Sequence, residues 1–362
     1  MGTKKSVKRP NRKRRATKVS YPGSGGPSGR FSEVLSIIRE GRNRAYSSAN
    51  SALVECYWRI GHYISSKVKS AQWGSGVVSE LADYLQHTVA GPRGFSERNL
   101  WRMMQFYDLY ASCEKLSPLV TQVPWTNHLI IISKAKSAEE REFYLKLCAS
   151  ERYSKRELER QIDASLFERT VSSPAKTSRA LLQRHPGAES VLRDSYALDF
   201  LGLPSGHSEE DLRKAIVGNL KSFIIEFGRD FAFVGEEYRL QVGMKDFRLD
   251  LLFYHRELQC LVAIELKIDD FKPEHLGQMS FYLEALDRDV KKTHENPSIG
   301  IVLCKGKDDD VVEYALSRTL SPAAVSDYTT RLPDKHLLES KLHEFFDLSV
   351  REMRAPYDGG TP

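Results

Sequence analysis

The sequence predicts an α+β protein of two domains, an all-α N-terminal domain followed by an α/β domain with a mixed central sheet. Three observations support this prediction. Apolar residues recur at helical spacing through residues 31–168. Short runs rich in β-branched and aromatic residues replace that pattern beyond residue 228. Helical and strand-like segments then alternate, which is typical of a sheet covered by helices.

The composition is that of a globular protein with a tail of different character. The 362 residues are 41% hydrophobic and 28% charged, and no apolar run approaches the ~20 residues that a membrane helix needs, so we expect no membrane partner. The five cysteines form no C-x-x-C pair, which indicates reduced thiols in an intracellular protein. Ten of the 54 Lys and Arg precede the first acidic residue, Glu33, leaving 44 basic against 48 acidic residues. Nucleic-acid binding by the body must therefore rest on local patches.

The two ends and the middle of the chain differ from the domains in composition. Residues 1–30 are rich in Lys, Arg, Gly and Ser, so we expect a disordered basic arm. This arm could contact phosphates or act as a nuclear signal in a eukaryotic host, and the alternative is a tail that only keeps the protein soluble. We otherwise expect a cytoplasmic protein, associated with the nucleoid if bacterial. Residues 169–206 are turn-rich and are expected to form a linker, before a domain at 207–348 and a disordered tail at 349–362.

Helix-period apolar residues and capping signals place the first helices of the helical domain. The first helix is expected within 31–69, a shorter one at 77–90, and Ser96 is expected to cap a helix at 97–111. A turn followed by a polar helix could form a helix-turn-helix reader of DNA. Four side chains of that helix are candidates for nucleic-acid contact: Arg98, Asn99, Arg102 and Gln105. The alternative is an ordinary amphipathic helix with a solvated face.

Two further helices, at 137–149 and 154–167, complete the domain. Ser154 and Glu157 have the spacing of a capping box, which fixes the start of the second. His128 lies on an apolar helix and is expected to be a packed histidine. The domain could bind DNA or a protein partner, or mediate a homo-oligomer.

The C-terminal domain is expected to begin with a helix capped by Ser208 and closed by Gly228. Strands are expected at 231–234 and 238–242 and on both sides of a turn at 257–258. The later elements continue the alternation: a helix from 273, a strand at 295–306, a short helix at 311–317, a strand at 324–328 and a helix at 337–346.

Three polar side chains interrupt the apolar strands within 247–268: Asp250, Glu265 and Lys267. Glu265 and Lys267 are two residues apart, so they share one face of a strand. A two-residue turn at 257–258 places Asp250 directly opposite Glu265 on that face. Gathering two carboxylates and a lysine among apolar residues is costly unless a cation or a substrate lies among them.

These groups suit the hydrolysis of a phosphodiester bond with Mg²⁺ or Mn²⁺. The carboxylates of Asp250 and Glu265 and the backbone carbonyl of Leu266 are oxygen ligands of the kind that Mg²⁺ prefers. Lys267 could hold the attacking water, help to take its proton or stabilise charge on the phosphate. The alternative interpretation is a buried ion network with no substrate.

At these residues the chain resembles the PD-(D/E)XK nuclease superfamily and, within it, the YhcG-like family. Several segments are similar to that family's nuclease domain, among them FAFVGEEYRLQVG, FRLDLLFYHRELQCLVAIELKI, FKPEHLGQMSFYLEALD and HENPSIGIVLC. Others are similar to the helical domain found beside it: YWRIGHYI, GFSERNLWRMMQFY and YSKRELERQI. The resemblance spans about residues 45–345. It implies a restriction-endonuclease-like fold for the α/β domain and a nuclease acting on DNA, with RNA as a second option.

The resemblance also assigns roles. It implies that Asp250 and Glu265 bind the metal and that Lys267 is the catalytic lysine. It further implies that Gln278 and Tyr282 form the substrate-side Q-x-x-x-Y element of RecB-like members.

One feature of the superfamily is missing from the expected place. Its nucleases often carry a further Glu on the first helix as a metal ligand, and the expected middle of that helix here has Gly218. Glu226 is the acidic residue one or two turns later. A catalytically weak or inactive module that binds DNA or a protein partner is therefore the alternative function.

Other polar residues near these segments are expected to have structural roles. The run Asp308-Asp309-Asp310 is expected at the N-terminus of a helix, where the helix dipole favours negative charge. His255 and Arg256 are expected to be exposed at the hairpin turn. His275 could face the site or the surface.

Overall fold

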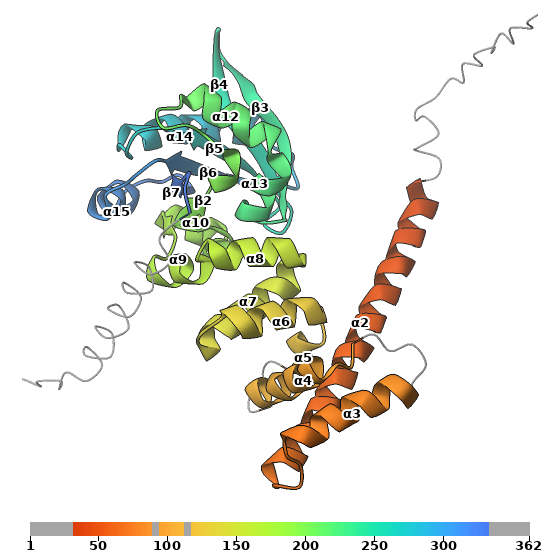
Figure 1. The fold of residues 1–362 in the computed structure, drawn as a ribbon. Coiled ribbons are helices and arrows are strands. Elements are labelled where there is room, and N and C mark those ends of the chain that lie inside the picture. Colours follow the sequence, from red (N-terminus) through yellow and green to blue (C-terminus); the bar gives the residue numbers. More distant parts are fainter. Residues whose placement is uncertain (1–31, 89–93, 112–116, 333–362) are drawn as a thin grey trace, which may run out of the picture.

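The computed structural model describes three stretches of the chain, residues 32–88, 94–111 and 117–332 (Figure 1). The expected basic arm at 1–30, the helix at 337–346 and the tail at 349–362 lie outside the described residues. A helical region is followed by a mixed-sheet domain, which confirms the predicted fold class. No helix within the described stretches is long and apolar enough to cross a membrane.

The N-terminal region is helical throughout. Its elements are α2 (Ser32–Lys69), α3 (Ser75–Thr88), α4 (Glu97–Tyr110), α5 (Ser117–Val120), α6 (Trp125–Lys134), α7 (Ala138–Glu151), α8 (Lys155–Asp163) and α9 (Leu166–Ser172). The second half of α2 packs on α4 around an aromatic core, in which the Phe106 and Trp125 rings lie 5.3 Å apart. His128 is fully buried against Phe106, and burial lowers its pKa to about 4, so it is the packed histidine that was predicted. The capping box of Ser154 and Glu157 is also present.

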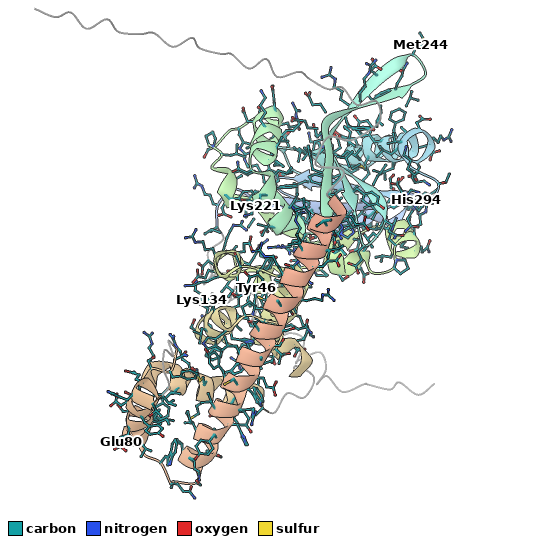
Figure 2. All side chains as sticks on the ribbon, turned by 90° about the vertical axis from the view of Figure 1, so that its right-hand side faces the viewer. Tyr46, Glu80, Lys134, Lys221, Met244 and His294 are labelled. Carbon is teal, nitrogen blue, oxygen red and sulfur yellow. The ribbon has the colours of Figure 1, made fainter. Side chains whose placement is uncertain are left out.

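The first half of α2 projects away from the other helices in Figure 1, and in Figure 2 the same helix lies toward the viewer, in front of the rest of the chain. Four large apolar side chains near its start are 46% to 60% exposed: Val34, Leu35, Ile37 and Ile38. Exposed apolar clusters of this kind often bind a partner. The homo-oligomer through the helical domain therefore stays a prediction, and this is the face to test.

The C-terminal domain is built on one sheet of seven strands. They are β1 (Lys176–Thr177), β2 (Ser195–Ala197), β3 (Phe231–Val242), β4 (Lys245–His255), β5 (Cys260–Leu266), β6 (Asn296–Cys304) and β7 (Ala323–Thr329). Their order is β1-β7-β6-β5-β4-β3, with β2 beside β7. Strands β5, β6 and β7 run parallel to one another. Strand β4 is antiparallel to both of its neighbours, β3 and β5. The sheet is therefore mixed, as predicted.

Helices cover both faces of this sheet. They are α10 (Arg179–Arg184), α11 (Ala188–Val191), η2 (Asp199–Leu201), α12 (Glu209–Gly218), α13 (Leu220–Phe227), α14 (Glu274–Ala285), η3 (Leu286–Val290) and α15 (Asp309–Ser317). On one face, Phe223 and Phe227 of α13 pack with Phe253 of β4. On the other, α14 approaches β6 so closely that a Cβ at Gly300 would lie 2.4 Å from the Met279 side chain. Two apolar layers thus fix the central strands that carry the candidate site.

Residues 169–206 are not the linker that was expected. Strands β1 and β2 within this segment pair with β7, and Leu181, Tyr196 and Leu198 are fully buried in the core on one face of the sheet. The segment is rich in turns because its elements are short. It is nevertheless part of the folded domain.

Three local predictions also need correction. The strands expected at 231–234 and 238–242 are one strand, β3, with a bulge between Phe233 and Gly235. The helix expected to run to Gly228 breaks at Asn219 into α12 and α13. His255 is 2% exposed, because it still belongs to β4 and packs against Phe231.

Candidate active site

The β4–β5 hairpin brings the two predicted carboxylates together. Leu251 lies opposite Ile264, so continuing the ladder by one residue places Asp250 beside Glu265. The backbone N–H of Asp250 lies 3.4 Å from Glu265 Oε1, and the backbone N–H of Leu266 donates to Asp250 Oδ2 at 2.9 Å. The predicted pairing is confirmed, although the turn has four residues, 256–259, instead of two. The predicted two-residue turn and the observed four-residue turn have the same centre, between 257 and 258, so both give the same strand register.

Lys267 completes the trio at the end of β5. Its Nζ lies 3.4 Å from Glu265 Oε2, which confirms that the two side chains share a face. Its backbone N–H donates to the Leu303 carbonyl of β6 at 2.8 Å, so the neighbouring parallel strand holds the lysine in place.

The charges of the trio depend strongly on one another. Glu265 is 3% exposed, and burial together with the Asp250 carboxylate raises its pKa to about 7. Burial disfavours the charge of Lys267, but the carboxylates of Glu265, Glu209 and Asp250 together raise its pKa. Two carboxyl groups that oppose each other's ionisation form a site that favours an added cation.

Helix α14 places the Q-x-x-x-Y pair next to the hairpin. Gln278 Nε2 donates to Tyr282 Oη at 2.9 Å, and Tyr282 Oη donates to the Arg248 carbonyl at 3.1 Å. Tyr282 is buried, whereas Gln278 is exposed at the surface of the helix. Burial raises the Tyr282 pKa, and the charges of Glu265 and Asp250 add to this effect. The structure thus groups these two residues with the trio.

Helix α12 adds two residues that the sequence analysis missed. Glu209 Oε2 lies 3.7 Å from Lys267 Nζ. One turn later, Arg213 Nη1 lies 3.6 Å from Asp250 Oδ1. The capping box of Ser208 and Asp211 fixes the start of α12 and so places Glu209 in its first turn. The Ser208-x-x-Asp211 spacing was the signal in the sequence that places the start of this helix.

Glu226, considered as a further ligand, lies elsewhere. It is fully buried on α13 and pairs with Arg160 at 2.9 Å and Arg169 at 3.3 Å, both from the helical region. Gly218 is not at the core-facing middle of a helix, since it is the exposed last residue of α12. The expected geometry of this helix was wrong because the break at Asn219 changes which residues face the sheet.

The backbone of β3 is strained opposite Asp250. Glu237 has φ +44°, a left-handed conformation that costs a non-glycine residue about 1–2 kcal/mol. Its carboxylate lies 3.3 Å from Arg213 Nη2. Arg213 is therefore held between Asp250 and Glu237, and its Nε is buried without a hydrogen-bond partner among the described residues.

The donor atoms at the site are oxygens, which fits Mg²⁺ or Mn²⁺. Asp250 and Glu265 could hold such an ion, with the Leu266 carbonyl as a further donor. In the described part of the chain, no group of three or more His, Cys, Asp or Glu side chains is placed to hold a metal. The pair fits an ion that keeps several of its waters and does not resemble a zinc site.

The remaining predicted residues lie outside this cluster. Arg98 and Gln105 are exposed on α4, and Arg102 is half-buried. Asn99 donates to the Gly94 carbonyl and accepts from Trp125 Nε1 at 3.3 Å, so its amide is engaged within the helical region. Asp308 caps α15, which confirms its structural role.

Comparison with known proteins identifies the family of this chain. Residues 189–343 match the YhcG PDDEXK nuclease domain, and residues 33–169 match the DUF1016 N-terminal domain. A relative from Escherichia coli (strain K12), named as a candidate nuclease, YhcG, is 32% identical over 347 residues, covering 85% of this chain and 92% of the relative. The chain belongs to the YhcG family. Its C-terminal domain is a PDDEXK nuclease domain, as the motif residues predicted.

Two solved structures are similar to part of this chain. A repair endonuclease from Pyrococcus abyssi is 16% identical, with a TM-score of 0.24, over 36% of this chain and 50% of that one. An EndoMS–double-stranded DNA complex is 18% identical, with a TM-score of 0.25, over 37% of this chain and 48% of that one. The chain spans about half the length of each.

Proposed function

We propose that this YhcG-family protein is a nuclease that hydrolyses phosphodiester bonds of DNA with Mg²⁺ or Mn²⁺, in endonuclease mode. The observation that carries the proposal is the trio on the hairpin, with Glu265 beside Asp250 and 3.4 Å from Lys267. In this proposal Asp250, Glu265 and the Leu266 carbonyl hold the ion. RNA is the alternative substrate.

In the proposed hydrolysis, each residue of the site has a separate role. A bound divalent ion supplies Lewis-acid charge at the phosphate. Lys267 has a raised pKa, so at neutral pH its ammonium group donates hydrogen bonds to the attacking water or to the phosphate. Tyr282 is tied to β4 two residues before Asp250 and presents Gln278 toward the substrate side. Glu209 helps to keep Lys267 charged.

The alternative is a nuclease fold that binds DNA or a protein partner without efficient cleavage. One observation favours it: the Arg213 guanidinium lies 3.6 Å from Asp250, where it competes with a metal ion for that carboxylate. Metal binding separates the two functions.

Replacing Arg213 with glutamine is expected to tighten Mn²⁺ binding about tenfold, because a positive charge beside a ligand repels the incoming ion. Isothermal titration calorimetry measures this effect independently of activity. Lys214→Gln is the matched control, since Lys214 is the next residue, is exposed and pairs with Glu210. Weaker Mn²⁺ binding after Arg213→Gln, with the control unchanged, would show that Arg213 supports the site instead of competing with the metal.

Metal binding by the unmodified protein is expected to weaken as pH falls. Burial and Asp250 raise the pKa of Glu265 to about 7, and only the deprotonated carboxylate is a good ligand. Mn²⁺ affinity should therefore drop about tenfold from pH 8 to pH 6, and Asp250→Asn should lower it at both values. Asp246→Asn, on the exposed part of β4, is the control. If Asp250→Asn leaves the Mn²⁺ affinity unchanged, Asp250 is not a metal ligand and the proposed metal site is wrong.

A further inference from the structure

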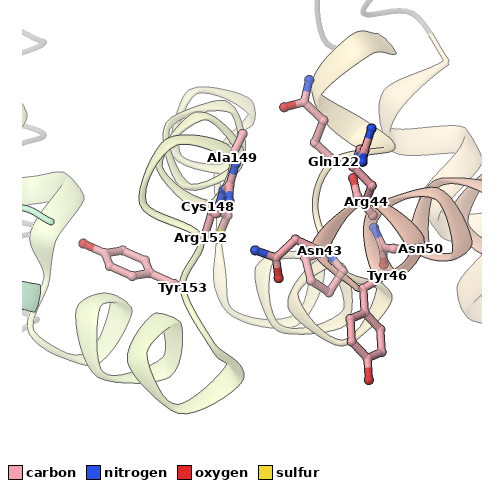
Figure 3. A pocket seen from close by; sticks show the side chains of 11 residues that line it. Asn43, Arg44, Tyr46, Asn50, Gln122, Cys148, Ala149, Arg152 and Tyr153 are labelled. Atoms are coloured by element: carbon pink, nitrogen blue, oxygen red, sulfur yellow. The ribbon is translucent and has the colours of Figure 1, made fainter. Parts of the chain in front are cut away.

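A second charged surface lies where the helical region meets the nuclease domain. Two adjoining cavities of about 540 Å³ and 900 Å³ share Arg152 as a lining residue. The first lies between α2 and the end of α7, and Figure 3 shows Asn43, Arg44 and Asn50 across from Cys148 and Arg152. The second is bounded by the start of α8, by α13 and by the β4–β5 turn. We call the two cavities together the junction groove.

The junction groove carries a surplus of positive charge. Five cations line it: Arg44, Arg152, Lys221, Arg229 and Arg256. Two of them have carboxylate partners, Arg229 with Glu157 at 2.9 Å and Arg256 with Asp230 at 3.5 Å. Among the residues that the structure describes, the other three, from α2, the α7–α8 turn and α13, form no ion pair within 4 Å. Glu157, which also lines the second cavity, interacts with Lys221 at longer range. No Asp or Glu lines the first cavity.

Arg152 stands at the centre of the groove in an unfavourable backbone conformation. It is the C-cap of α7 with φ +49° and ψ +46°, a left-handed position at which glycine is common. An arginine there costs about 1–2 kcal/mol of backbone strain relative to an unstrained position. Left-handed non-glycine residues often occur at ligand sites, where the side chain is needed.

We propose that the junction groove is a nucleic-acid exosite that binds the phosphodiester backbone of the substrate. The inference rests on the proposed nuclease function and adds a binding site away from the catalytic hairpin. Arg44, Arg152 and Lys221 supply cations for successive phosphates. Tyr46, 68% exposed at the rim of the first cavity, supplies a ring on which a base can stack.

The exosite lies just beyond the C-terminal end of β4, whereas Asp250 of the catalytic trio is at the middle of that strand. Arg256 is six residues from Asp250, which is about 20 Å along an extended strand. A nucleic acid that reaches both sites must therefore extend over about six nucleotides, at 3.4 Å for each nucleotide of one strand. Short oligonucleotides should reach only one site.

The test uses fluorescently labelled DNA of 30 nucleotides, as a single strand and as a duplex, and the full chain in EDTA. Fluorescence anisotropy measures the binding affinity at several salt concentrations. The triple variant Arg44→Gln/Arg152→Gln/Lys221→Gln is expected to bind at least about tenfold more weakly. The slope of log affinity against log salt concentration should become less negative by about 2, since each phosphate contact contributes about 0.7–0.9 to that slope. The DNA form that loses affinity identifies whether a single strand or a duplex occupies the groove.

The matched control removes the same charge elsewhere. Arg184, Lys292 and Arg318 are exposed, lie outside the groove and form no ion pair with the described residues. The triple variant Arg184→Gln/Lys292→Gln/Arg318→Gln should bind within about twofold of the unmodified protein, with thermal unfolding reporting that both variants fold. Equal binding by the two triple variants would overturn the exosite. Because EDTA removes any metal, failure of the metal-dependent nuclease would not produce that result.

Discussion

Replacing Lys267 with alanine is expected to lower the rate of DNA cleavage at least about a hundredfold, while the protein stays folded. The ammonium group is the cation beside Glu265, with a pKa raised by the surrounding carboxylates, and in the proposed reaction it stabilises charge that develops at the phosphate. Removing one such preorganised donor typically costs about 10²–10³ in rate. Single-turnover cleavage with saturating Mg²⁺ measures the loss in the chemical step.

Lys272→Ala is the matched control for this variant. Lys272 lies five residues further along, just before α14, and is exposed. It should cleave DNA at the unmodified rate. Full activity of Lys267→Ala would remove Lys267 from the reaction, whatever the control shows.

Replacing Glu226 with alanine is expected to destabilise the protein by about 3–5 kcal/mol, the usual cost of leaving a buried charge without its partner. Glu226 is fully buried and accepts from Arg160, Arg169 and the Ala197 backbone N–H. Arg193 also donates to its backbone carbonyl at 2.5 Å. The variant would leave three guanidinium groups around an empty position between the helical region and the nuclease domain.

Urea unfolding of the full chain measures this loss, and Glu210→Ala provides the control. Glu210 is exposed on α12, and its one ion pair within the described stretches is with Lys214, so its removal should leave the midpoint unchanged. Burial opposes the charge of Glu226, but the three arginines lower its pKa overall. Its contribution is thus complete above the ordinary pKa of a Glu and is lost as pH falls through the lowered value. An unchanged midpoint for Glu226→Ala would contradict the proposed role of this cluster.

The pairing of Asp250 with Glu265 in the β4–β5 hairpin could be predicted from the sequence, because the register of a hairpin depends only on where its turn is centred. A turn of two or of four residues around 257–258 pairs Asp250 with Glu265 in the same way. The alternation of side chains along β5 then fixes Lys267 on the same face. The local spacing of polar residues in an apolar strand was sufficient here.

The contribution of α12 could not be predicted in this way. The periodicity over 208–228 is compatible with one long helix, and that helix directs attention to Gly218 and Glu226. The break at Asn219 changes the direction of the chain, so that α12 presents Glu209 and Arg213 to the site while α13 turns Glu226 toward the helical region. Asn219 is only a weak local signal for a helix break. We therefore attribute the break to tertiary packing.

The turn-rich segment 169–206 failed as a linker for a related reason. Its strands have two and three residues, too short for a period-two pattern to be visible. They are strands because the edge of β7 that β6 does not occupy pairs with both of them. Pairing of this kind with residues more than 100 positions away leaves no trace in the local sequence.

We propose that Asp250, Glu265 and Lys267 form a metal-dependent phosphodiesterase site. Its most direct test is Mg²⁺-dependent cleavage of a panel of single-stranded, double-stranded and branched DNA and RNA by the unmodified protein and by Glu265→Gln in parallel. We expect that DNA is cut with Mg²⁺, that EDTA stops the reaction, and that Glu265→Gln is inactive while remaining folded. Cleavage that continues unchanged in EDTA or in Glu265→Gln would contradict it.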